Sequence, residues 1–216
     1  MMRNFGIFTS AIMAGICISI GCIAFLTVGG LYGAILFSFG LLSVVHYRLK
    51  LYTGTVGFMR LFPVCHKDII QHSDNTRIYP SYKDTWTTLL LVILGNIAGC
   101  ILTAFAASWS SFAISSEAIV LSRLSLPWWS VIVRAAFCGF IMTTAVKFGR
   151  EEKWLPLLFG VPLFIMCGFL HSIADSFYYA FSGILTLKAA TWLGLTYVGN
   201  YIGCSLYKLF TKNDAA

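Results

Sequence analysis

The stretch VPLFIMCGFLHSIADSFYYAFSG, residues 161–183, is as apolar as a membrane-spanning segment but carries a histidine and an acid near its middle. His171 and Asp175 are four residues apart, so a continuous helix would place them one turn apart on the same face. Ionisable groups at membrane depth are costly unless they face a polar cavity or a partner. The stretch therefore predicts a functional site inside a membrane protein, with the rest of the chain around it.

The composition of the whole chain also indicates a membrane protein. Of its 216 residues, 58% are hydrophobic and 11% are charged, and the mean hydropathy is +0.82. Long continuous apolar runs favour helical spans over a β-barrel. The run after Asn4 is too long for a cleaved signal peptide, so the first span is expected to be retained. We expect one all-α domain over residues 1–216, embedded in the lipid bilayer of the inner or plasma membrane.

Charge and cysteine content exclude several classes of function. The formal net charge of +7 comes from Lys and Arg residues in loops, so no nucleic-acid partner is predicted. The seven cysteines show no CxxC or CxxH spacing, and they are expected to pack between helices rather than to bind a metal or form disulfides. No cofactor is expected. Without an acid pair, a Ser/His/Asp set or a His-rich cluster, the chain is not expected to be an enzyme.

The apolar runs predict six membrane spans, of which the second and the fifth are broken. The spans are expected at residues 5–28, 31–47, 85–107, 128–146, 154–187 and 189–210. Irregular backbone is expected at residues 51–55 and 170–176, which is tolerated at membrane depth only where it is buried in protein or lines a cavity. Arg134 falls inside the fourth span, where it either snorkels to the interface or lines a vestibule.

The positions of the basic residues predict the orientation of the chain. If the N-terminus is inside, all but three of the fifteen Lys and Arg residues fall in inside segments; the three are Arg123, Arg134 and Lys188. Inside loops of membrane proteins are enriched in Lys and Arg. Both termini are therefore expected to be cytoplasmic.

A short motif, G-N-x-x-G-C, occurs twice, at residues 95–100 and 199–204. Each copy follows a broken span, so residues 1–108 and 125–211 are expected to be two copies of a three-span unit. An odd number of spans per unit inverts the second copy, and the two broken helices then meet at mid-depth, which places Thr53 near His171. The motif alone is also typical of close helix packing, with the asparagine bonded across helices.

These motifs resemble those of the formate/nitrite transporter family. The sequence GFLHSIAD at residues 168–175 is similar to the family's fifth-helix motif, commonly GFEHSIAN, and KLYTGT at residues 50–55 is similar to its second-helix loop, commonly ELFTGN or ELFTS. The paired Gly-Asn helices match as well, and the similarity covers nearly the whole chain. The resemblance implies an aquaporin-like fold and a homopentameric anion channel with one pore in each protomer.

The resemblance also implies roles for single residues. His171 is similar to the family's central pore histidine and Thr53 to its loop threonine. Aromatic and aliphatic residues fall on the family's constrictions, and Arg123 falls where members carry a vestibule lysine. The resulting pore or substrate-binding residues are His171, Thr53, Leu51, Tyr52, Phe37, Leu41, Phe164, Arg123, Lys50 and Asp175.

The chain departs from the family pattern at four positions. Lys50 and Leu170 replace glutamates, and Asp175 and Gly139 replace asparagines. A lysine in place of an acid makes the inner mouth more attractive to anions, which keeps the broad class of substrate.

The function predicted from these residues is passage of small monovalent anions of weak acids, such as formate, nitrite or hydrosulfide. Apolar narrowings would exclude water and hydrated cations, His171 would donate a hydrogen bond or a proton to the anion, and Thr53 would orient it. The alternative is a channel for neutral solutes, water or gas with a similar outline. That alternative predicts no dependence of flux on membrane potential or on Arg123.

Overall fold

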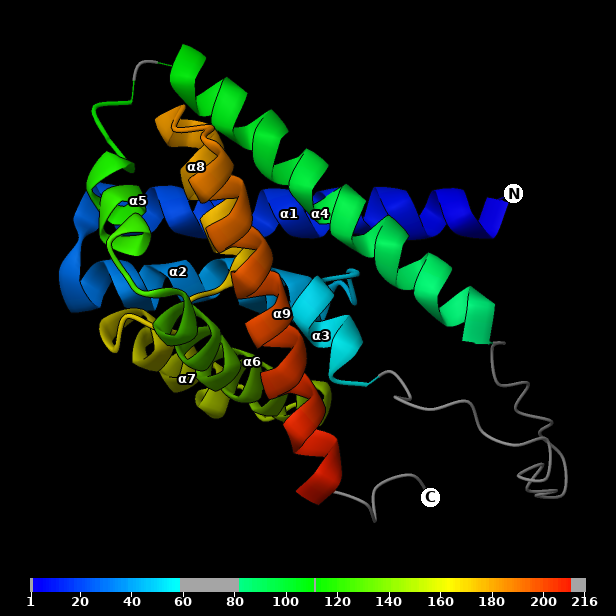
Figure 1. Cartoon of the computed structure of the whole chain (residues 1–216). Coiled ribbons are helices and arrows are strands. Elements are labelled where there is room, and N and C mark those ends of the chain that lie inside the picture. Colours follow the sequence, from blue (N-terminus) through cyan, green and yellow to red (C-terminus); the bar gives the residue numbers. More distant parts are fainter. Residues whose placement is uncertain (1, 59–81, 111, 211–216) are drawn as a thin grey trace, which may run out of the picture.

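The computed structural model describes residues 2–58, 82–110 and 112–210, and this part of the chain folds into helices without a strand (Figure 1). The helices in chain order are α1 (Met2–Val28), α2 (Gly30–His46), α3 (Tyr52–Val56), α4 (Tyr82–Trp109), α5 (Glu117–Leu124), α6 (Trp128–Arg150), α7 (Leu155–Met166), α8 (Ser172–Ser182) and α9 (Leu187–Phe210). The expected all-α fold is confirmed. Residues 59–81, between the predicted second and third spans, lie outside the described residues.

Several helices have the length and the surface of membrane spans. Among the described residues, Arg3–Val28, Trp86–Trp109 and Trp128–Arg150 are long and apolar enough to cross a membrane, and α2 and α7 are shorter apolar helices. Large apolar side chains point outward from them, including Phe105 and Phe159, which are 67% and 72% exposed. Such a surface is expected where lipid rather than water surrounds the protein. These helices indicate a membrane protein.

Two spans are interrupted, as the sequence predicted, but the predicted boundaries are wrong. Irregular backbone occurs at residues 47–51, between α2 and α3, and at residues 167–171, between α7 and α8. The polar Thr and Ser residues that suggested later breaks belong instead to the first turns of α3 and α8. Such residues are common at helix starts, because their side chains can bond free backbone groups there.

The two interruptions have the same backbone conformation. In each, the second residue is left-handed, with φ of 54° at Arg48 and 65° at Gly168. The last residue is extended, with φ and ψ of −95° and 139° at Leu51 and of −110° and 113° at His171. A new helix begins immediately after each of these two residues.

Two helix pairs pack without room for side chains at their glycines. α1 packs against α4, and α6 packs against α9. A Cβ atom added to Gly99 would overlap the carbonyl of Ile12, and one added to Gly203 would overlap the carbonyl of Ala136. Backbones this close need glycine. The glycines of both G-N-x-x-G-C motifs therefore serve helix packing, as the sequence indicated.

The short helices that follow the breaks enter the interior between these pairs. α3 contacts α4, α6 and α9, while α8 contacts α1, α4, α5 and α9. Every residue from His171 to Tyr179 is buried, as are residues 51–54. The two helix starts are therefore inside the protein, surrounded by apolar spans.

Candidate functional site

The centre of the site is a buried pair formed by α3 and the start of α8. Thr53 Oγ1 and His171 Nε2 lie 3.4 Å apart, and the two residues are 0% and 1% exposed. His171 Nδ1 accepts a hydrogen bond from the backbone N–H of Ala174, at 3.2 Å. In the neutral imidazole, the proton therefore resides on Nε2, which faces Thr53. The structure thus brings together the two residues that the sequence predicted to meet.

Aromatic rings cover one side of this imidazole. The ring of Phe164 stacks on that of His171 with centroids 5.7 Å apart, and Phe37 meets Phe164 edge-on at 5.9 Å. Both phenylalanines are buried, as are Leu41 and Leu51, which belong to the same apolar cluster. The surroundings of the imidazole are therefore apolar, with the hydroxyl of Thr53 opposite one ring nitrogen.

Two further predicted residues, Tyr52 and Lys50, are held by neighbouring helices. The Tyr52 hydroxyl donates to the carbonyl of Tyr197 at 2.9 Å, and the two rings lie 5.0 Å apart, so this side chain is bound to α9. Lys50 is exposed, and its backbone N–H donates to Ser10 Oγ on α1 at 3.1 Å. The ring nitrogens of His171 face Thr53 and the N–H of Ala174 instead.

Arg123 and Asp175 form an ion pair that joins α5 to α8. Arg123 Nε donates to Asp175 Oδ1 at 3.0 Å, and the side chains are 19% and 2% exposed. The other carboxylate oxygen of Asp175 is buried and has no hydrogen-bond partner among the residues that the structure describes. The sequence predicted both as site residues without pairing them. The structure shows that the acid balances the charge of the cation.

The first asparagine of the repeated motif binds the end of the first break. Asn96 Oδ1 accepts from the backbone N–H of Tyr52 at 2.8 Å. Its Nδ2 donates to the carbonyls of Lys50 and Ala11, at 2.9 and 2.8 Å. Asn96 is fully buried. The sequence indicated that this residue bonds across helices but did not show that it binds the interruption itself.

The second asparagine makes the corresponding contacts at the second break. Asn200 Oδ1 accepts from the N–H of Ser172 at 2.8 Å, and its Nδ2 donates to the carbonyls of Leu170 and Ala135, at 2.8 and 2.7 Å. It is also fully buried. The recurrence of the motif after each broken span is the sequence signal that could have assigned this role.

Arg134, left open between two placements by the sequence, is bound to the second break. Its Nη1 donates to the carbonyl of Gly168 at 3.4 Å, and its Nε donates to Ser130 Oγ at 3.2 Å. The side chain is half-buried. Arg134 therefore satisfies a carbonyl that the interrupted helix leaves free.

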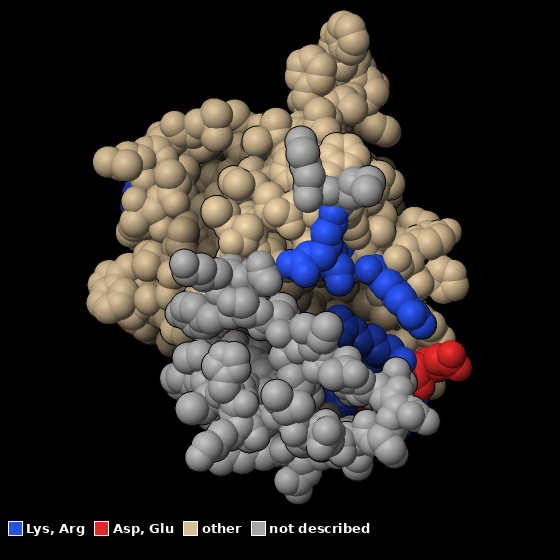
Figure 2. Space-filling view, turned by 90° about the vertical axis from the view of Figure 1, so that its right-hand side faces the viewer, with Lys and Arg blue, Asp and Glu red and all other residues tan. Residues whose placement is uncertain are grey.

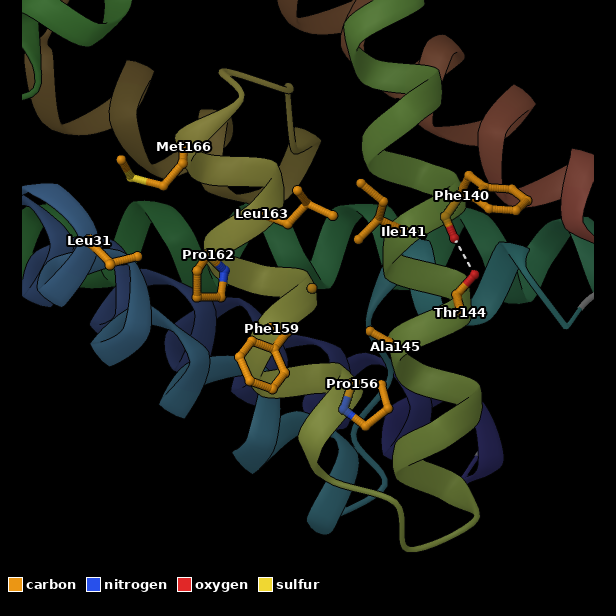
Figure 3. A pocket seen from close by; sticks show the side chains of 11 residues that line it. Leu31, Phe140, Ile141, Thr144, Ala145, Pro156, Phe159, Pro162, Leu163 and Met166 are labelled. Carbon is orange, nitrogen blue, oxygen red and sulfur yellow. Dashed lines mark hydrogen bonds between the residues drawn. The ribbon is translucent and has the colours of Figure 1, made fainter.

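A basic face and an apolar groove lie outside this centre. Figure 2 shows Lys and Arg side chains gathered on the face at the right of Figure 1, and exposed basic residues include Arg48, Lys50, Arg150 and Lys153. The groove, of about 570 Å³, lies between α6 and α7 and is lined by residues such as Phe159 (Figure 3). None of its lining residues belongs to the predicted site. Among the described residues, no group of three His, Cys, Asp or Glu side chains is arranged to hold a metal ion.

Comparison with known proteins gives the family. The family model described as formate/nitrite transporter matches residues 1–211. A solved structure described as a pentameric formate channel with formate bound has a TM-score of 0.75 and 21% identity, and the match covers 97% of this chain and 96% of that one. Another, described as an FNT family ion channel, has a TM-score of 0.74 and 19% identity, covering 94% and 87%. Among curated proteins, no sequence matches. The helices, the two breaks and the family match together show that this chain belongs to the formate/nitrite transporter family.

Proposed function

We propose that the protein is a membrane channel for small monovalent anions of weak acids, of which formate, nitrite and hydrosulfide are the candidates. The observation that carries the proposal is the buried imidazole of His171, enclosed by apolar side chains and facing the hydroxyl of Thr53 at 3.4 Å. In a chain of the formate/nitrite transporter family, this is the polar centre that a small anion needs on an otherwise apolar route.

The geometry supports a specific role for each member of the pair. A separation of 3.4 Å leaves no room between the two groups, but an anion that lies beside both can accept a hydrogen bond from each. The Nε2–H of His171 donates a hydrogen bond to the anion, and the Thr53 hydroxyl donates a second one. Transfer of a proton to the anion requires the imidazolium form, with the proton supplied from solvent, because loss of the Nε2 proton from the neutral ring would leave an imidazolate. Protonation of a weak-acid anion removes most of its desolvation cost, so such anions pass more easily than chloride.

Apolar residues around the pair select against other ions. Phe37, Phe164, Leu41 and Leu51 are each at most 3% exposed. A hydrated cation loses its water in such a constriction without gaining ligands, which is unfavourable. Exposed Lys50 raises the local concentration of anions at the inner mouth.

We further propose that residues 1–108 and 125–211 are inverted repeats of three spans each, with both termini in the cytoplasm. The matching backbone of the two breaks and the matching contacts of Asn96 and Asn200 support this arrangement. By likeness to the pentameric formate channel, we propose a homopentamer in the inner or plasma membrane, with a path through each protomer.

The test is anion flux in proteoliposomes that contain the purified protein. Formate, nitrite and hydrosulfide should enter faster than chloride, lactate or glycerol. The variant His171→Phe should lose at least about 90% of formate flux, because the donor in the apolar centre is gone. His46→Phe is a matched control, since His46 is exposed at the end of α2. Wild-type flux in assembled His171→Phe would contradict the proposal, and rapid glycerol entry without anion flux would favour a neutral-solute channel.

A further inference from the structure

We propose that Asn96 and Asn200 are positioning residues that set the conformation of one residue each, Leu51 and His171, at the ends of the two breaks. The transport part of this inference rests on the proposed function, whereas the structural part does not. Neither asparagine needs to touch a passing anion for this role.

The contacts of Asn200 fix both backbone dihedrals of His171. The Asn200 side chain binds the carbonyl of Leu170 and the N–H of Ser172, each at 2.8 Å. These two groups belong to the planar peptide units on either side of His171. Because φ and ψ describe the rotation of those units, holding both of them fixes the extended conformation at this residue. The direction of the imidazole follows from that conformation.

Asn96 fixes the backbone dihedrals of Leu51 in the same way. It binds the carbonyl of Lys50 at 2.9 Å and the N–H of Tyr52 at 2.8 Å, on the two sides of Leu51. Leu51 is 2% exposed and belongs to the apolar narrowing proposed above. Asn200 thus holds His171, the proposed hydrogen-bond donor of the path, and Asn96 holds Leu51, which is part of its apolar wall.

Each asparagine is itself anchored to a packed helix. Its third hydrogen bond goes to a carbonyl on the partner helix, Ala11 of α1 for Asn96 and Ala135 of α6 for Asn200. Removing either side chain leaves buried backbone groups without partners, at a cost of about 1–3 kcal/mol each. Each break is therefore held in place relative to a tightly packed helix pair. The first break is held against α1/α4 and the second against α6/α9.

Two cysteines, one turn after the asparagines, add contacts to the other short helix. Cys204 Sγ lies 3.5 Å from the carbonyl of Thr53, and Cys100 Sγ lies 3.3 Å from the carbonyl of Ile173. α9 therefore contacts the backbone at both members of the Thr53–His171 pair, through Cys204 and Asn200. This helix sets the separation between the two polar groups.

The first experiment measures backbone amide exchange in the purified protein. In Asn200→Leu, the amide of Ser172 should exchange at least about tenfold faster, because its acceptor is gone, while the amide of Tyr52 stays protected. Asn96→Leu should show the reverse. Asn4→Leu is the control, since Asn4 is exposed near the start of α1 and should change neither amide.

The second experiment measures selectivity, expressed per assembled channel. Asn200→Leu should lower the ratio of formate to chloride flux by roughly tenfold, because a misplaced donor loses its advantage. Asn96→Leu should leave that ratio near its wild-type value and raise lactate flux, because it loosens the narrowing at Leu51. A role in stability alone would reduce the amount of folded protein and would change neither the formate-to-chloride ratio nor the lactate flux per assembled channel.

The outcomes separate this inference from the proposed function. Unchanged exchange at Ser172 and Tyr52, or the same selectivity change in both variants, would overturn the positioning role. If amide exchange changes in the variants but the wild-type protein transports no anion, the positioning of the backbone is supported and the proposed function is overturned. If the leucine variants do not assemble, Asn200→Ser and Asn96→Ser, which are smaller and still polar, take their place with the same expectations.

Discussion

At the scale of the residue, the ion pair between Arg123 and Asp175 reduces the positive charge that Arg123 presents to its surroundings. Arg123 Nε donates to the carboxylate of Asp175, and the N–H of Asp175 in turn donates to the carbonyl of His171 at 2.8 Å. The acid thus lies one turn from the imidazole and balances a cation that would otherwise attract anions. A buried acid without its cation is far less favourable than the pair.

Asp175→Asn should increase anion flux, because it frees the positive charge of Arg123 while keeping the shape of the side chain. We expect about a threefold to tenfold increase at low ionic strength and a much smaller one in high salt, where the attraction is screened. Initial rates of formate entry over a series of salt concentrations measure this effect.

Arg123→Leu is the converse of that change and should reduce flux, since the carboxylate of Asp175 then carries an unbalanced negative charge. The double variant Arg123→Leu/Asp175→Asn should fall between the two single variants. If flux is the same in all three, the pair has only a structural role.

At the scale of the element, the backbones of α6 and α9 are in close contact. Gly203 faces the backbone of Ala136 without space for a Cβ atom, whereas Gly194, on the same helix α9, has nothing from the described part of the chain within 4 Å of such an atom. The two glycines therefore differ in packing but share a helical backbone. This difference provides a matched pair of substitutions.

Gly203→Ala should destabilise the protein by about 1–3 kcal/mol or more, because the added methyl group forces α6 and α9 apart. Gly194→Ala should be neutral or stabilising by up to about 1 kcal/mol, since alanine favours a helix over glycine. Thermal unfolding in detergent, followed by the loss of assembled protein, compares the two. Equal stability of both variants would show that the contact between the helices is less close than described.

At the scale of the whole molecule, the proposed inverted repeat places successive loops on opposite sides of the membrane. The turn after α6 contains the exposed residue Glu152, and the turn between α8 and α9 contains Leu185, which is 80% exposed. A single crossing by the broken span α7–α8 separates these two turns. They should therefore face different compartments.

One cysteine introduced at a time at these turns tests the orientation. The background lacks Cys65 and the exposed Cys167. An impermeant thiol reagent added to intact cells should label Leu185→Cys, and it should label Glu152→Cys only after the membrane is opened. Labelling of both variants from outside would contradict the proposed topology, and the opposite pattern would reverse the orientation.

The sequence predicted those features of the fold that depend on nearby residues. The apolar runs gave the helices, and the positions of Gly and polar residues gave the existence of two breaks. Their boundaries were wrong, because Thr53 and Ser172 read as helix-breaking residues although each lies in the first turn of a new helix. Local composition does not distinguish the end of a break from the helix that follows it.

Contacts between distant segments were harder to predict. The approach of Thr53 to His171, 118 residues apart, could be predicted only because the repeated motif implied an arrangement of the spans. The pairing of Arg123 with Asp175 depends on where α5 packs, and α5 lies between the predicted third and fourth spans, where no element was predicted. The bonds of Asn96 to Lys50 and Tyr52 likewise depend on how α4 approaches the first break.

At the two breaks, the asparagines bind the peptide groups beside Leu51 and His171 and not the side chains of those two residues. Mutation of Leu51 or His171 therefore leaves the hydrogen bonds of the asparagines available. The side chain at position 51 or 171 can then be exchanged while the backbone that presents it keeps its geometry, so the chemistry of the path and the framework that holds it are separable.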